Sequence, residues 1–169
     1  MDAAVLEKIK KIRYILLDVD GVLTNGTVFL NERGEEMLGF SIYDGLGIDL
    51  LIKAGLKVGF LSGRDSRAVA KRALMLGVED CYLGISDKRN TYQKILTKHG
   101  LKDEQVLYMG DDLIDLPVLR RVGVSVSVPN AVDTVKKEVD WVTEKRGGEG
   151  AVREMIDIIL FSAGKTSTP

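Results

Sequence analysis

The feature that most constrains this chain is the alternation of short apolar segments with segments of helical period. Six segments rich in β-branched and aromatic residues are predicted strands, at residues 14–20, 57–62, 81–85, 106–110, 124–128 and 141–143. Several are apolar throughout, as parallel strands covered on both faces should be. Strands and helices in alternation predict a doubly wound, Rossmann-like and mostly parallel α/β sheet.

Capping residues mark the helices between these strands. Four helices are predicted, over residues 45–55, 65–76, 88–100 and 149–161. Asp65 or Ser66 can cap the second of them, and Gly77 supplies its end. A length of 169 residues favours one domain with a continuous core, over residues 1–161, followed by a small, polar and flexible tail at 162–169.

Residues 26–42 interrupt the alternation and predict a projecting β-hairpin after the first strand. Two apolar stretches flank Asn31-Glu32-Arg33-Gly34, in which Gly34 can take a positive φ. Four apolar side chains are hard to bury on so small a hairpin: Val28, Leu30, Leu38 and Phe40. Their packing against other copies of the chain is favoured over folding back onto their own domain.

Composition limits the kinds of partner and metal site. With 24 basic and 25 acidic side chains the net charge is -1, so no bulk attraction to nucleic acid or anionic membrane follows. One cysteine excludes an intrachain disulfide, and one histidine makes a Cys/His metal site hard to assemble. Residues 1–13 lack the apolar core of a secretory signal, and no apolar stretch is long enough to span a bilayer, so a cytoplasmic setting is expected.

Two aspartates, Asp18 and Asp20, come at the end of the first strand, where Gly21 breaks the apolar run. Ligands of an open α/β sheet bind outside the carboxyl ends of its strands. Asp18 can attack a phosphoryl group as a nucleophile, and Asp20 can protonate the leaving alcohol. Taken alone, the pair is equally compatible with aspartates that start a turn or cap a helix.

A second acidic cluster, Asp111, Asp112 and Asp115, follows Gly110 at the end of the fourth strand. If that strand lies beside the first, the two clusters converge and can hold Mg²⁺ with oxygen ligands. The expected ligands are Asp18, the backbone carbonyl of Asp20, and Asp111. Asp112 or Asp115 is expected to orient these ligands without touching the metal itself.

Positive and hydrogen-bonding groups are needed on the phosphate as well. Ser62 and Gly63 follow the second strand, and Lys88 opens a helix after the third, so these residues are predicted to bind phosphate. A helix cap and a solvated lysine are the alternative interpretations. Arg64 and Arg146 are candidates to bind the carboxylate of a sugar acid, and the site of an adjacent subunit is one place where Arg146 could do so.

The four features in this order resemble the haloacid dehalogenase superfamily of phosphatases: Asp18-Val19-Asp20-Gly21-Val22-Leu23-Thr24, Ser62-Gly63-Arg64, Lys88, and Gly110-Asp111-Asp112-Leu113-Ile114-Asp115. Within it, the chain from about residue 12 to 160 resembles the 3-deoxy-D-manno-octulosonate 8-phosphate phosphatase family. Further matching segments are Gly34-Glu35-Glu36, Asp44-Gly45-Leu46-Gly47-Ile48, Ser62-Gly63-Arg64-Asp65-Ser66 and Gly147-Gly148-Glu149-Gly150-Ala151-Val152-Arg153-Glu154.

The resemblance implies a domain without a cap, Mg²⁺, and a homotetramer built around the hairpins. It also implies hydrolysis of the 8-phosphate through an aspartyl-phosphate, in lipopolysaccharide precursor synthesis. Asp18 would be the nucleophile, Asp20 the acid and base, Ser62 and Lys88 the phosphate ligands, and Asp111 a metal ligand. Tyr43 stands where many members have arginine, so no substrate contact of that arginine carries over.

Two other functions remain open on the sequence. One is a phosphatase of the same architecture that acts on a nine-carbon sialic-acid-type phosphate. The other is a non-catalytic module for tetramerisation, similar to domains fused to sugar-nucleotide transferases. Retention of Asp18, Asp20, Lys88 and Asp111 disfavours the module, because a scaffold has no need of them.

Overall fold

The computed structural model describes residues 2–164, so most of the predicted tail lies outside the described residues. Six strands form one sheet in the order β5-β4-β1-β6-β7-β8, and all neighbouring pairs are parallel. The strands are β1 (Tyr14–Leu17), β4 (Lys57–Leu61), β5 (Asp80–Tyr82), β6 (Val106–Met109), β7 (Val124–Ser127) and β8 (Trp141–Val142). The predicted doubly wound, Rossmann-like sheet is confirmed.

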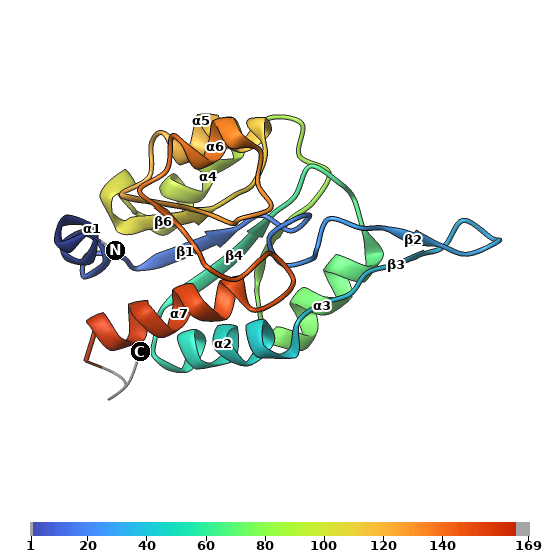
Figure 1. Cartoon of the computed structure of the whole chain (residues 1–169), viewed down its shortest axis with the longest axis horizontal. Helices are drawn as coiled ribbons and strands as arrows, with labels where there is room; N and C mark the ends of the chain where they lie inside the picture. The colour runs from blue at the N-terminus through green and yellow to red at the C-terminus, as the bar shows by residue number, and fades with distance from the viewer. Residues whose placement is uncertain (1, 165–169) are drawn as a thin grey trace.

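Helices cover both faces of this sheet (Figure 1). Seven α-helices are described: α1 (Ala3–Ile9), α2 (Ile42–Lys53), α3 (Arg67–Leu76), α4 (Lys88–His99), α5 (Leu116–Leu119), α6 (Asp133–Lys136) and α7 (Ala151–Ser162). Two 3₁₀ turns, η1 (Asp103–Gln105) and η2 (Leu113–Asp115), precede β6 and α5. In Figure 1, α2, α3 and α7 lie on one side of the sheet, and α4, α5 and α6 on the other.

The centre of the core is formed by β1 and β6, whose residues are all buried. Their side chains are apolar on both faces because helices cover both, which explains the uninterrupted apolar runs in the sequence. The structure shows no helix among the described residues that is long and apolar enough to cross a membrane.

Several predicted boundaries were wrong by a few residues. The first strand ends at Leu17 rather than at residue 20, because the loop that carries the aspartates begins there. The helix expected from Gly45 begins at Ile42, since the Ser41 side chain caps it by accepting from the Asp44 amide. The last helix continues to Ser162, which was assigned to the tail. Helix α1 was not predicted; Asp2 caps it.

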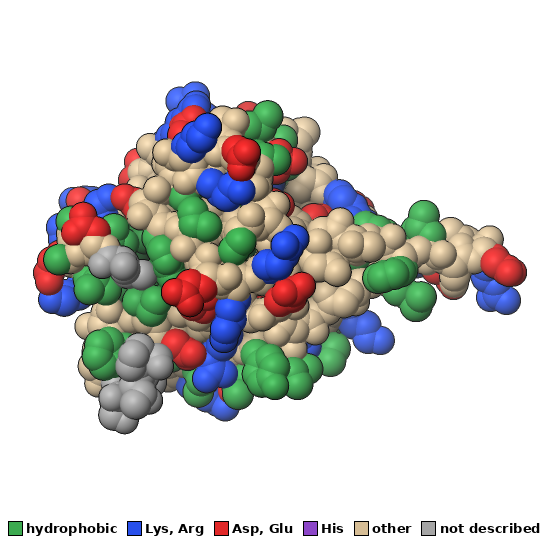
Figure 2. All heavy atoms as spheres, in the orientation of Figure 1, with side chains coloured by type: hydrophobic (Ala, Val, Ile, Leu, Met, Phe, Trp, Pro, Cys, Tyr) green, Lys and Arg blue, Asp and Glu red, His purple; other side chains and the backbone are tan. Residues whose placement is uncertain are grey.

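A β-hairpin projects from the sheet at the expected place, after β1. Its strands β2 (Phe29–Leu30) and β3 (Glu36–Met37) pair antiparallel, and Gly34 at the turn has φ +74°. Both strands are shorter than the apolar stretches at residues 27–30 and 37–42 that flank the turn in the sequence. Leu38 and Phe40, for which packing against other copies was favoured, are instead half-buried against the core of their own chain. Figure 2 shows hydrophobic side chains along the projecting arm, which reaches well beyond the rest of the molecule.

Candidate active site

Neighbouring strands bring the two acidic clusters together. Strand β1 lies between β4 and β6, so the loops after these three strands meet at one edge of the sheet. Asp18 continues the pairing of β1, because its amide donates to the Met109 carbonyl oxygen at 2.9 Å. Carboxylate oxygens of Asp18, Asp111 and Asp115 all lie within 4.8 Å of one another. The predicted convergence of the clusters is therefore observed.

Two of these carboxylates, Asp18 and Asp111, line a cavity of about 270 Å³. Its lining comes from the loops after β1, β4 and β6: Asp18, Asp20, Gly26, Gly63, Arg64, Asp111, Asp112 and Ile114. Among the predicted site residues, Ser62, Lys88 and Asp115 lie beneath this lining and are buried. Arg146 is exposed and does not belong to the lining.

Lys88 is the cation at the centre of the cluster. Its Nζ donates to Asp18 Oδ1 at 2.8 Å and to Asp115 Oδ1 at 2.7 Å. Burial alone would lower the pKa of Lys88, but the two carboxylates outweigh it and raise the pKa above its usual value. Lys88 therefore stays charged, and it is held beside the predicted nucleophile.

Asp115 supports both the lysine and the loop that carries Asp111. Its Oδ2 accepts from the backbone amides of Asp111 and Asp112 at 3.0 and 3.1 Å. The other carboxylate oxygen, Oδ1, accepts from the Tyr108 hydroxyl as well as from Lys88. Asp112 is exposed, and its side chain caps the 3₁₀ turn η2 through the amide of Leu113. Asp115 is thus the better placed of the two candidates for support.

The acids outnumber the nearby cations, which is what a site for a hard cation requires. Burial and the charge of Asp115 raise the pKa of Asp18 well above its usual value. The same two causes raise the pKa of Asp111 to about 6. A cation between the carboxylates would stabilise their charged forms, so the oxygen donors fit Mg²⁺.

The turn after Asp20 depends on glycine. Gly21 has φ +86°, and a Cβ at this position would lie 2.0 Å from Asp111 Oδ2. Its carbonyl oxygen accepts from the side chain of Asn130 at 2.8 Å, and Asn130 in turn accepts from the Gly147 amide at 2.8 Å. Gly21 therefore permits the close approach of the two acidic loops, while Asn130 ties the first loop to residues 145–150.

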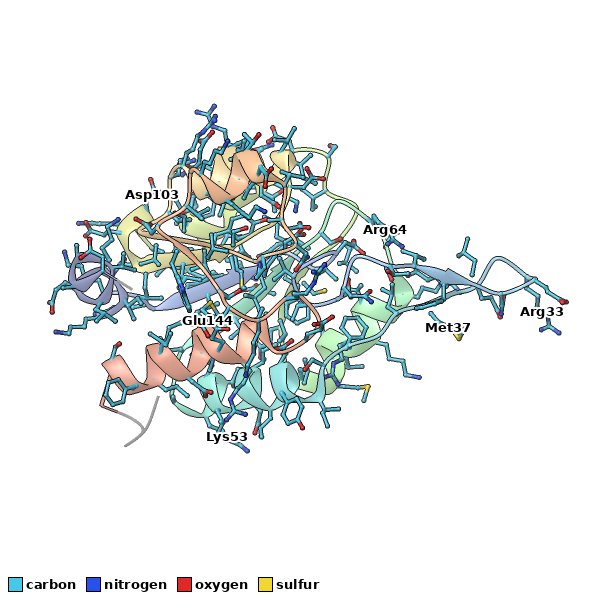
Figure 3. All side chains as sticks on the ribbon, viewed as in Figure 1. Arg33, Met37, Lys53, Arg64, Asp103 and Glu144 are labelled. Carbon is cyan, nitrogen blue, oxygen red and sulfur yellow. The ribbon has the colours of Figure 1, made fainter. Side chains whose placement is uncertain are left out.

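The side chains of Ser62 and Arg64 both contact the carboxylate of Asp20. Ser62 is fully buried; its hydroxyl accepts from the Arg64 amide at 3.1 Å and lies 3.5 Å from Asp20 Oδ2. Arg64 Nη1 donates to Asp20 Oδ1 at 2.9 Å, and Nη2 donates to Glu36 of the hairpin. Figure 3 shows Arg64 beside the base of the hairpin, far from Arg33 at its tip.

Three residues of this network were not identified from the sequence: Tyr108, Glu36 and Asn130. Tyr108 carried a signal, since it is a polar-tipped side chain in an otherwise aliphatic strand that precedes an acidic loop. Asn130 also carried one, because it follows β7 at the same edge of the sheet. Glu36 lies in a segment that carries the family resemblance, but nothing in the sequence pairs it with Arg64, because only the three-dimensional path of the hairpin brings the two together.

Comparison with known proteins points to one family. A family model described as haloacid dehalogenase-like hydrolase matches residues 82–156. The 3-deoxy-D-manno-octulosonate 8-phosphate phosphatase KdsC of Escherichia coli strain K12 is 39% identical over 165 residues, which are 98% of this chain and 88% of that protein.

Two solved structures are closely similar. The phosphatase of the same name from Yersinia pestis has a TM-score of 0.96 at 39% identity, covering 98% of this chain and 89% of that chain. The enzyme from Moraxella catarrhalis, in complex with a magnesium ion, a phosphate ion and 3-deoxy-D-manno-octulosonate (KDO), has a TM-score of 0.93 at 36% identity. That match covers 95% of this chain and 92% of the other. This chain belongs to the 3-deoxy-D-manno-octulosonate 8-phosphate phosphatase family of haloacid dehalogenase-like hydrolases.

Proposed function

We propose that this chain, a phosphoric monoester hydrolase by its family, uses Mg²⁺ to hydrolyse 3-deoxy-D-manno-octulosonate 8-phosphate to KDO and phosphate. The observation that carries the proposal is the cluster of Asp18, Asp111 and Asp115, in which Asp18 and Asp115 are buried and share Lys88 while Asp18 and Asp111 line an open cavity. The choice of substrate is supported by relatives that bear this activity in their names and by the one that holds KDO. The proposed setting is lipopolysaccharide precursor synthesis in the cytoplasm.

The reaction has two steps. The Asp18 carboxylate attacks phosphorus, the bond from phosphorus to the sugar oxygen breaks, and Asp20 gives that oxygen a proton. Asp20 then takes a proton from water, whose oxygen attacks the aspartyl-phosphate, so that phosphate leaves and Asp18 is restored. Bound Mg²⁺ would neutralise charge on the phosphate oxygens.

The geometry of this chain supports these roles for its residues. Lys88 touches Asp18 at 2.8 Å and is placed to bind a phosphate oxygen beside it. Asp20 is half-buried on the cavity wall, where a leaving alcohol can reach it. Ser62 and the Gly63 backbone complete the proposed phosphate site. Asp18, the Asp20 carbonyl and Asp111 would hold the metal, and Asp115 would support them through the amides of Asp111 and Asp112.

The cavity has no lid within its own chain among the described residues, because the interval between β1 and α2 holds only the hairpin. We propose that copies of the chain assemble through their hairpins into a homotetramer, which narrows the cavity entrance. The exposed apolar side chains of Phe29, Leu30 and Met37 support this. In such an assembly Arg146, which is exposed, could reach the substrate carboxylate of a neighbouring site, and Arg64 could do so in its own.

A substrate panel tests the proposal. Phosphate release is measured at matched Mg²⁺ on the eight-carbon 8-phosphate, a nine-carbon sialic-acid-type 9-phosphate and a neutral hexose phosphate. We expect the highest kcat/KM on the eight-carbon compound, complete loss with a chelator, and recovery when Mg²⁺ is added back. A higher kcat/KM on the nine-carbon compound would overturn the substrate, and turnover of none would leave the non-catalytic module as the better account.

A further inference from the structure

The hairpin contacts the catalytic edge of the sheet through the side chain of Glu36, on β3. One carboxylate oxygen of Glu36, Oε2, accepts from Arg64 Nη2, and the other, Oε1, accepts from the Ser66 hydroxyl. Both oxygens therefore have partners, and both partners come from the loop that follows β4. These are contacts within one chain, so they need no second copy of the chain to form.

Arg64 connects Glu36 to Asp20, the proposed acid and base, by binding both carboxylates. Its second terminal nitrogen, Nη1, donates to Asp20 Oδ1 at 2.9 Å. One guanidinium thus bridges two carboxylates, and its planar fork of donors fixes their relative placement. Because the Arg64 side chain is 40% exposed, packing alone does not hold it in this position.

The other partner of Glu36 gives the contact a rigid base. Ser66 is buried, and its hydroxyl oxygen also caps α3 by accepting from the Val69 amide at 3.3 Å. Glu36 is therefore held at one oxygen by the start of a helix, while the other oxygen holds Arg64. A carboxylate anchored in this way restricts the arginine more than a free surface partner would.

We propose that Glu36 is a positioning residue for Asp20, and that it acts through Arg64. This rests on the proposed function, because Asp20 must protonate the leaving alcohol. Without the Glu36 charge the guanidinium is free to swing between Asp20, solvent and substrate, and the Asp20 carboxylate loses its fixed orientation. Small displacements of a general acid are costly, since proton transfer needs hydrogen-bond contact with the leaving oxygen.

The dependence on leaving group isolates this role. The value of kcat/KM reports only on steps up to departure of the alcohol, and p-nitrophenol departs without help from an acid. For Glu36→Gln we expect kcat/KM to fall about ten-fold on the sugar-acid phosphate and less than about two-fold on p-nitrophenyl phosphate. Retained hydrolysis of p-nitrophenyl phosphate also shows that the variant is folded and that its nucleophile and metal site are intact.

Glu35→Gln is the matched control. Glu35 precedes Glu36 on the same hairpin and is exposed, and its side chain accepts from Asn31 Nδ2 at 2.6 Å, away from Arg64. Loss of this charge should leave kcat/KM unchanged on both substrates. If any loss of charge on the hairpin had this effect, kcat/KM would instead fall equally in Glu35→Gln and Glu36→Gln.

A double-mutant cycle tests whether the effect passes through Arg64. Arg64→Met removes the bridge between Glu36 and Asp20. In that background, Glu36→Gln should cause no further fall in kcat/KM on the sugar-acid phosphate. An undiminished effect of Glu36→Gln there would overturn the proposal, as would an equal loss on both substrates or no loss on either.

The same measurements separate this inference from the proposed function. Suppose that the wild-type chain hydrolyses p-nitrophenyl phosphate and an alkyl phosphate other than the 8-phosphate, but not the 8-phosphate itself. That result contradicts the proposed substrate alone. The leaving-group comparison is then made on that alkyl phosphate, with the same expected ratio. A wild-type chain that hydrolyses no phosphate ester contradicts the proposed function and the role of Glu36 together.

Discussion

At the scale of single residues, Gly21 sets how closely the two acidic loops approach. A Cβ there would overlap Asp111 Oδ2 at 2.0 Å, and φ of +86° is unfavourable for any other residue. We expect Gly21→Ala to push the loops apart and lower kcat at least about ten-fold, because a shift of about 1 Å in a catalytic group costs up to 10²-fold. Phosphate release checks this, with Gly39→Ala as control, since a Cβ at Gly39 meets nothing within 4 Å. Equal activities would contradict it.

Asp111 links metal binding to pH. Burial and the charge of Asp115 raise its pKa to about 6 when no cation is bound. Below that pH a proton competes with Mg²⁺ for the carboxylate, and above it the site is ready for the metal. We expect the Mg²⁺ concentration that gives half-maximal activity to rise several-fold between pH 7.5 and about pH 5.5. A requirement for Mg²⁺ that does not change over this range would contradict the prediction.

The carboxylates and the lysine of the candidate site were easier to predict from the sequence than the residues that hold them in place. Asp18, Asp20 and Asp111 were found because each follows a strand with a recognisable apolar run. The structure brings Lys88 and Ser62 to them, as expected. Glu36 could not be assigned to the site this way, because it lies on the hairpin and not after a strand of the main sheet; Asn130 follows β7, but its partners Gly21 and Gly147 are known only from the fold.

At the scale of elements, the C-terminal end of α4 contacts the sheet at the edge opposite the candidate site. Asp80, which opens β5, accepts from the Tyr14 hydroxyl at 2.9 Å and from Lys98 Nζ at 2.5 Å. His99 Nε2, at the end of α4, lies 2.6 Å from the same carboxylate. The contact joins the starts of β1 and β5 to the last turn of α4, the helix whose first residue is Lys88.

Because of this contact, the free energy of unfolding should fall at acid pH. Burial of Asp80 alone would raise its pKa, but hydrogen bonds from Lys98 and Tyr14 outweigh it and lower the pKa below the usual value. A lowered pKa means that the stabilisation is present above the unfolded value, about 3.9, and is lost as pH falls through the folded value. We expect Asp80→Asn to lower the free energy of unfolding in urea by about 1–3 kcal/mol at pH 7.

The difference from wild type should begin to shrink as pH falls below about 4, where Asp80 of the unfolded chain takes up a proton, and it should vanish once pH lies below the lowered pKa of Asp80 in the folded protein. Asp49→Asn on α2 is the control, because its partner Lys53 lies on an exposed helix face. A difference that stays constant down to pH 3 would show that the Asp80 charge does not supply the stabilisation.

The six strands of the sheet and the helices α2, α3, α4 and α7 were predicted from the sequence, whereas their ends and the short helices α1, α5 and α6 were not. The strands were recognised from apolar runs, but their ends are set by site loops whose hydrogen bonds are tertiary. The hairpin strands are shorter than predicted because residues 38 and 40 turn back onto the core, which no local pattern shows.

At the scale of the whole molecule, the projecting hairpin predicts assembly. Leu30 is 68% exposed on an arm with no core of its own. We expect sedimentation to give four times the 18.6 kDa chain mass for wild type and a smaller species for Leu30→Glu, since a buried interface rejects an unpaired charge. Leu74→Glu on α3, where the side chain is 80% exposed but lies away from the hairpin, should stay tetrameric. A monomeric wild type would contradict the assembly.

The central claim is that Asp18 is the nucleophile of an Mg²⁺-dependent phosphatase, and an isosteric change tests it most directly. Phosphate release from the 8-phosphate is measured for wild type and for Asp18→Asn, which keeps the shape of the side chain but removes its charge. We expect steady turnover with Mg²⁺ by the wild type and a loss of at least about 10³-fold in the variant. Turnover by Asp18→Asn within about ten-fold of wild type would contradict the account.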